Sequence, residues 1–171
     1  MLTDPVLGLV LGVSVYTDLR WRKVYNALTF PAAAFGVAAG ASEGGIPGLA
    51  SSLAGLLVGL LATLALFRVG ALGGGDVKLV AAVGALKGYL FVVDAIIYMF
   101  LWGGVLALVF SAAKGRLGET LRKTARMAVS ALGRRVTPEP APLESSCTIP
   151  YALAVFGGTV LAWILPRGGV S

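Results

Sequence analysis

Two aspartates in this apolar sequence have neighbours that suit hydrolytic chemistry. Asp18 lies in "TDLRWRKVYNALT", and Asp76 directly follows three glycines in "GALGGGDVKL". A carboxylate beside apolar helices is costly and glycine loses much entropy on folding, so a purely structural segment rarely combines the two. Two facing carboxylates cannot both ionise easily, so one keeps a proton while the other acts as general base on a water between them. Such a pair can hydrolyse a peptide bond, and we expect no metal and no cofactor.

Each aspartate also has a structural explanation. Asp18 could pair with Arg22 one helical turn later, and Asp76 could be an N-cap residue after a glycine loop. The chain has only four aspartates. The topology predicted below puts Asp18 and Asp76 at one membrane depth, which favours a shared role over two separate structural roles. Either residue could hold the shared proton.

Other acidic residues are weaker candidates for catalysis. Asp94 is expected near the opposite face, where it could pair with Lys87. Glu139 and Glu144 lie in a proline-rich stretch, where positioning a water would be difficult.

The glycines at positions 73–75 suit a site that admits a peptide. Side chains there would obstruct an extended substrate backbone beside Asp76, and a turn this tight can require a positive φ. We therefore expect Gly73 and Gly75 to border the path of the substrate.

The composition is that of an integral membrane protein. Of the 171 residues, 57% are hydrophobic and 13% are charged, and the mean hydropathy is +0.88. With one cysteine and no histidine, an internal disulfide, the usual zinc ligand sets and Ser/His or Cys/His catalysis are excluded. The apolar pattern continues from end to end, which predicts a single membrane-embedded domain over residues 1–171.

Hydropathy predicts an all-α, polytopic membrane bundle of about six transmembrane helices. The first span lacks a basic region and a cleavage site, so we interpret it as retained and not as a signal peptide. Three pairs of glycines are expected to let helices approach closely: Gly36 with Gly40, Gly55 with Gly59, and Gly84 with Gly88. The predicted spans are residues 4–19, 26–41, 48–68, 76–88, 89–113 and 149–166.

Basic residues are concentrated on one side of this predicted topology. With an external N-terminus, the other face has only Lys87 and Arg167. The positive-inside rule then makes the basic face cytoplasmic and puts Asp18 and Asp76 on that side. Basic residues spread over several loops are typical of contact with anionic lipid headgroups, so we expect membrane lipids and no nucleic acid as partners. The twelve basic residues of this face are Arg20, Arg22, Lys23, Arg68, Lys78, Lys114, Arg116, Arg122, Lys123, Arg126, Arg134 and Arg135.

The longest polar segment, residues 114–146, is expected on the cytoplasmic side. Its first part has the spacing of an amphipathic helix lying on the membrane surface, and its second part is a proline-rich linker. The segment is either a solvated connector or a surface that receives a partner or substrate. Cys147 follows it and is interpreted as an ordinary small residue.

Three stretches resemble the motifs of a known protease family. "GGGDVKL" resembles the GxGD motif of polytopic aspartyl proteases, in the prepilin-peptidase form with a lysine two residues after the aspartate. "DLRWRKVYNALT" resembles the first-aspartate motif of the type IV prepilin peptidase family, and "IPYALAVFGG" resembles its last helix. Tyr25 stands where the family usually has proline, which leaves open how the second helix starts.

The resemblance implies a membrane aspartic endopeptidase whose catalytic residues are Asp18 and Asp76. Gly73, Gly75 and Lys78 would belong to the motif beside the substrate. The family removes short basic leaders from prepilins and preflagellin-like proteins, at the cytoplasmic face of the inner (cytoplasmic) membrane. The chain lacks the Cys-x-x-Cys pairs of many bacterial members, so it resembles the short form of tight-adherence pilus systems and archaea, without expected N-methyltransferase activity.

Two other functions are compatible with parts of the sequence. An intramembrane GxGD protease of the signal-peptide-peptidase type has nine spans and adjacent Tyr-Asp, whereas Thr17 separates Tyr16 from Asp18 here. A small ion- or proton-coupled transporter could use two aspartates to bind a cation or relay protons. That function does not explain the glycines before Asp76. The oligomeric state is not indicated by the sequence.

Overall fold

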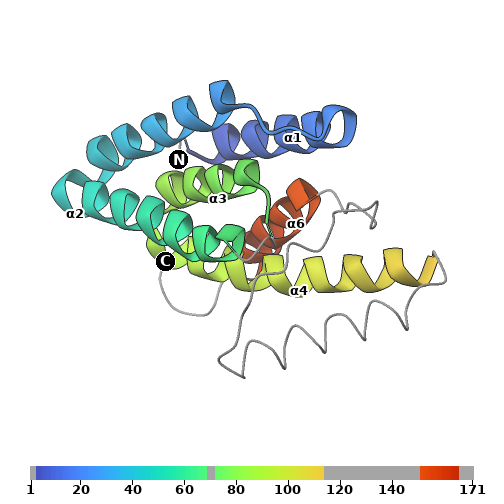
Figure 1. The fold of residues 1–171 in the computed structure, drawn as a ribbon. Helices are drawn as coiled ribbons and strands as arrows, with labels where there is room; N and C mark the ends of the chain where they lie inside the picture. Colours follow the sequence, from blue (N-terminus) through green and yellow to red (C-terminus); the bar gives the residue numbers. More distant parts are fainter. Residues whose placement is uncertain (1–2, 69–71, 114–150, 166–171) are drawn as a thin grey trace. The chain divides into compact units, whose positions relative to one another are not determined.

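The computed structural model describes residues 3–68, 72–113 and 151–165, and this part of the chain is all-α, as predicted (Figure 1). The predicted segment 114–146 and Cys147 lie outside the described residues. The predicted helical segments agree closely with the observed helices. These are α1 (Thr3–Trp21), α2 (Asn26–Arg68), α3 (Gly74–Lys87), α4 (Tyr89–Ala113) and α6 (Tyr151–Ile164).

Helix α2 is bent, and its two arms correspond to the two spans predicted at 26–41 and 48–68. The break is at Gly45, whose φ of 58° and ψ of −141° are not helical. Only glycine adopts this conformation at little cost, so the sequence places the bend there. The arms then pack on each other, and Ser52 Oγ donates a hydrogen bond to the carbonyl oxygen of Gly36 at 3.4 Å.

Helix α3 is the buried core of the described bundle. Ten of its fourteen residues are buried, and it contacts α1, both arms of α2, and α6. The contacts with α2 are backbone to backbone. A Cβ on Gly36 would lie 2.6 Å from the carbonyl carbon of Ala85, and one on Gly59 would lie 2.8 Å from the carbonyl oxygen of Val80. Close helix approach at the glycine pairs is therefore confirmed.

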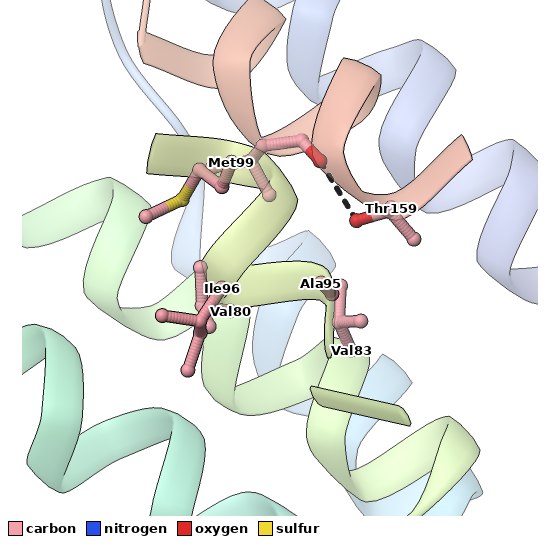
Figure 2. Close-up of a pocket in the computed structure, with 7 residues that line it drawn as sticks. Val80, Val83, Ala95, Ile96, Met99 and Thr159 are labelled. Carbon is pink, nitrogen blue, oxygen red and sulfur yellow. Dashed lines mark hydrogen bonds between the residues drawn. The ribbon is translucent and has the colours of Figure 1, made fainter. Parts of the chain in front are cut away.

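Helices α3, α4 and α6 meet along an apolar seam, shown in Figure 2. Val80 and Val83 of α3 face Ala95, Ile96 and Met99 of α4. The seam has no space for a water molecule. Close packing therefore fixes α6 against the core. On α6, Thr159 Oγ1 turns back to donate a hydrogen bond to the carbonyl oxygen of Val155 at 2.7 Å.

Two helices of the described part are long and apolar enough to cross a membrane, namely α2 and the Tyr89–Leu106 part of α4. Helix α3 has 14 residues, which gives a rise of about 21 Å, less than the ~30 Å of a hydrocarbon core. The predicted count of six crossings therefore stays a prediction. The contacts divide the chain into two units, residues 1–103 with 150–171, and residues 104–149. Of the second unit, the structure describes the last turns of α4.

Candidate functional site

The two aspartates lie at the same end of an antiparallel pair of helices. Asp18 is in the last turn of α1, and Asp76 is in the first turn of α3. Their carboxylates are close enough for the charge of Asp18 to act on Asp76. At the other end of the same pair, Asp4 of α1 forms an ion pair with Lys87 of α3. The structure thus brings together the two residues that the sequence selected.

Asp76 is enclosed by protein. The residue is only 7% exposed. Its Oδ2 accepts a hydrogen bond from the backbone N–H of Gly73 at 3.3 Å. Helix α3 is not one of the two helices able to cross a membrane. Burial, followed by the negative charge of Asp18, raises the pKa of Asp76 from 3.8 to about 6, although the Gly73 N–H acts in the opposite direction.

Asp18 is half-buried and is held by a helix that the sequence did not connect with it. The backbone N–H of Ala152, in the first turn of α6, donates to Asp18 Oδ2 at 3.3 Å. This hydrogen bond ties the Asp18 side chain to the start of α6. Tyr151 is close enough to Asp76 for the two groups to interact electrostatically. The start of α6 therefore borders both aspartates.

The structural explanations offered for the aspartates have different outcomes. Asp76 is not the N-cap residue, which is Gly73; it is the third residue of α3, and its side chain accepts the backbone N–H of Gly73. Asp18 does not form an ion pair with Arg22 in the described structure. Instead, the N–H of Arg22 donates to the backbone oxygen of Asp18 at 2.8 Å, and Arg22 takes a left-handed φ of 53° that ends α1. Helix α2 then begins at Asn26, directly after Tyr25.

The glycine turn differs from the expectation in its backbone conformation. Gly73 has φ −78° and ψ 150°, an extended conformation that any residue can adopt. Positive φ at a glycine occurs among the described residues at Gly45 and Gly88. A Cβ at Gly75 would lie 2.9 Å from the Cβ of Val24. Gly75 is therefore needed because the chain after α1 packs directly on it.

Lys78 points away from the aspartates. Its Nζ donates a hydrogen bond to Asn26 Oδ1 at 2.8 Å and lies 5.7 Å from the centre of the Phe30 ring. Positions two apart on a helix are rotated by about 200°, so the lysine and Asp76 are on opposite sides of α3. The lysine of the motif therefore does not neutralise the carboxylate pair.

Lys87, which the sequence assigned to Asp94, has a different partner. Its ammonium pairs with Asp4 at the start of α1. The two residues are distant in sequence but adjacent in space because α1 and α3 run in opposite directions. Sequence spacing favoured Asp94 because Asp94 lies within two turns of Lys87 along the chain.

A separate cavity lies between the first turns of α1 and the last half of α6. Its volume is about 310 Å³. Its walls are mostly apolar, with Asp4 among the lining residues. The cavity is near the Asp4 end of α1 and so belongs to the opposite end from the aspartate pair. Within the described ranges, no three Asp, Glu, Cys or His side chains gather closely enough to hold a metal ion.

Comparison with known families assigns the chain. Residues 6–112 match the type IV leader peptidase family. The chain belongs to this family. No curated protein and no solved structure matches it. The matched range contains Asp18, Asn26, Asp76 and Lys78, whereas Ala152 and the rest of α6 lie beyond it. Membership makes the chain a protease of the leader peptidase type.

Proposed function

We propose that this leader peptidase is a membrane aspartic endopeptidase that uses Asp18 and Asp76 to activate water. The observation that supports this most directly is the meeting of the two carboxylates at one end of α1 and α3. A structural carboxylate in such a place normally has a cation beside it. Here the adjacent Lys78 is bonded to Asn26 instead.

The environments of the two aspartates suggest different roles. Asp76 is the more deeply buried, and its raised pKa favours the protonated form. Asp18 is more exposed, and its Oδ2 accepts the Ala152 N–H at the start of α6. In the proposed mechanism Asp18 takes a proton from the water as it attacks the peptide carbonyl. Asp76 donates its proton to the carbonyl oxygen, and the leaving amine later takes a proton from the pair.

The proposed substrates are type IV prepilins or preflagellin-like proteins, whose short basic leaders would be removed. The family acts on substrates of the prepilin type. Carboxylates attract a basic segment, and Asp18 lies at the end of a helix, where an extended leader could approach. The hydrophobic stretch that follows a leader would remain in the membrane while the leader is cut.

We also propose that the chain is a multi-pass protein of the inner (cytoplasmic) membrane with its site facing the cytoplasm. Many large apolar side chains are exposed, among them Ile46 at 83% and Trp163 at 64%, as expected for surfaces that face lipid. The uneven distribution of lysine and arginine supports the orientation. After replacement of Cys147, a cysteine at position 74 should be labelled from the cytoplasm and one at position 43 from outside. Cytoplasmic labelling of position 43 would reverse the orientation.

The test of the proposed activity is direct. The purified protein, in detergent or liposomes, is incubated with a prepilin, and the mass of the product gives its new N-terminus. We expect cleavage between the basic leader and the hydrophobic stretch, and none with Asp18→Asn or Asp76→Asn. The matched control is Asp4→Asn, the same substitution at the other end of α1, which should still cleave. Full activity of either variant at the pair would contradict the proposed mechanism.

A further inference from the structure

Two sequence motifs that lie far apart along the chain each contribute one partner to a single hydrogen bond. Lys78 comes from "GGGDVKL", and Asn26 comes from "DLRWRKVYNALT". Lys78 Nζ donates to Asn26 Oδ1 at 2.8 Å, and the same ammonium lies 5.7 Å from the centre of the Phe30 ring. Lys78 therefore joins the N-terminal part of α3 to the start of α2.

Asn26 directly follows the short connection that leaves the Asp18 helix. Helix α1 ends at Trp21 and α2 begins at Asn26, so only residues 22–25 lie between them. This connection meets α3 at two neighbouring places. Val24 packs on Gly75, where an added Cβ would lie 2.9 Å from the Val24 Cβ, and Asn26 accepts the hydrogen bond of Lys78. The two contacts lie on either side of Asp76 in sequence.

The location of these contacts means that they set the separation of the carboxylates. Asp18 is in the turn that precedes the connection, and Asp76 is between the two α3 residues that hold it. The hydrogen bond of Lys78 is exposed to solvent, so its contribution to the free energy of folding is modest. Catalysis is far more sensitive to position, because a displacement of about 1 Å can cost about 100-fold in rate.

We propose, on the basis of the proposed function, that Lys78 and Asn26 form a positioning pair that holds the Asp18 end of α1 against the Asp76 end of α3. The pair keeps both carboxylates within reach of one water. Lys78 acts by holding the chain in position, and its charge does not act on the reacting atoms. Its orientation away from Asp76 is required for this role, because an ammonium beside the carboxylates would hold them both ionised.

The kinetic test compares Lys78→Met, Asn26→Leu, the double variant and Asn26→Asp on a prepilin substrate. We expect each single variant to lower kcat by about tenfold or more with KM within about threefold, because the aligned geometry and not the binding is lost. The double variant should be no slower than the slower single variant. Asn26→Asp should stay within about threefold of wild type, because a carboxylate accepts the lysine hydrogen bond at least as well.

The pH profile of kcat/KM separates positioning from a direct electrostatic effect. Lys78→Met should not raise the midpoint of this profile, because the ammonium does not act on Asp76, and a wider separation from the negative charge of Asp18 lowers the pKa of Asp76. A raised midpoint, which is the effect of removing a cation that acts on Asp76, would overturn the proposal. So would wild-type kcat in both single variants, or a loss in Lys78→Met with none in Asn26→Leu, since the lysine would then act without its partner.

Hydrogen exchange tests the pair without reference to activity. Lys78→Met should speed amide exchange in residues 22–26, and the matched variant Lys87→Met, which changes the lysine at the other end of α3, should not. Unchanged exchange in Lys78→Met would contradict the pair. A wild-type protein that cleaves no prepilin would instead contradict the proposed function, and the exchange result would still decide whether the pair holds the connection.

Discussion

The two ends of the antiparallel pair α1 and α3 use charge in opposite ways. At one end, Asp4 of α1 meets Lys87 of α3, and the negative and positive charges compensate each other. At the other end, Asp18 of α1 meets Asp76 of α3, and both side chains are acidic. The lysine nearest in sequence, Lys78, is bonded to α2 on the opposite side of the helix.

Both ends belong to the same two helices, so the difference in charge between the ends does not arise from the fold. It arises from which side of α3 each lysine occupies. Lys87 is directed toward α1 and compensates Asp4, whereas Lys78 is directed toward α2 and does not compensate Asp76. A carboxylate pair that keeps a proton is costly for stability but suited to acid–base chemistry. An ion pair joins the two helices at one end, and the proposed function assigns catalysis to the other end.

The largest expected effect comes from removing the carboxylates of the catalytic end. Asp18→Asn and Asp76→Asn should each lower kcat/KM for prepilin cleavage by about 1,000-fold or more, because asparagine keeps the shape but cannot exchange the proton. If both residues act on one water, the double variant should be about as inactive as either single variant. A loss within about tenfold for a single variant, which is about 1.4 kcal/mol, would be too small for a catalytic aspartate.

Stability should change in opposite directions at the two ends. Burial and the charge of Asp18 raise the pKa of Asp76 from its ordinary value of 3.8 to about 6 in the folded protein, so its ionised form opposes folding. This cost is fully present above pH 6 and absent below pH 3.8, and it amounts to about 3 kcal/mol. Asp76→Asn should therefore raise the unfolding midpoint at pH 7.5.

Asp4→Asn should lower the same midpoint. It leaves the Lys87 side chain, which is 14% exposed, without its anionic partner, at a cost of about 1–3 kcal/mol. Thermal unfolding in detergent compares the two variants with the wild type. Changes of the same sign in both would contradict the view that only one end is built for stability.

Much of this arrangement could be predicted from the sequence because apolar helices appear in it as long, continuous hydrophobic stretches. The predicted spans at 26–41 and 48–68 appear as the two arms of α2, and the bend lies at Gly45 between them. Asp18 and Asp76 could be selected because carboxylates and consecutive glycines are rare in apolar segments.

Contacts between distant segments could not be predicted in the same way. The Ala152 N–H that reaches Asp18 is a backbone group, so no residue type in the sequence marks it. Proximity along the chain suggested that Lys87 could pair with Asp94, whereas the ion pair shown by the structure is with Asp4, which antiparallel packing brings close. The positive φ expected in the glycine turn was wrong for Gly73, and the function of Gly75 depends on Val24, which precedes it by fifty-one positions along the chain.

The pH dependence of cleavage should reflect the proton on Asp76. Activity that needs the protonated form is present below its pKa and is lost as the pH rises through about 6. Above that midpoint kcat/KM should fall by about tenfold for each pH unit. Asp4→Asn should leave this midpoint unchanged, because Asp4 is at the other end of the helix pair. A flat profile between pH 5 and pH 8, measured with the wild type, would show that Asp76 does not act as the acid.

The smallest expected effect concerns the close packing at the catalytic end. Gly75→Ala places a Cβ 2.9 Å from the Cβ of Val24, so the connection after α1 must shift and Asp18 with it. We expect a loss of about fivefold to tenfold in kcat, in line with a displacement well under 1 Å. Gly74→Ala should be nearly silent, since its Cβ would lie 3.5 Å from the Phe67 ring, an ordinary contact.

A second substitution separates packing from substrate access as the reason for Gly75. Val24→Gly removes the Cβ that Gly75→Ala would meet, whereas Val24→Ala keeps it. If the protein's own packing requires the glycine, Val24→Gly should restore part of the kcat lost in Gly75→Ala and Val24→Ala should not. If the glycine instead makes room for a substrate backbone, neither change at Val24 should help, and the loss should appear in KM. That result would return Gly75 to the role that the sequence first indicated and would limit the packing argument to Lys78 and Asn26.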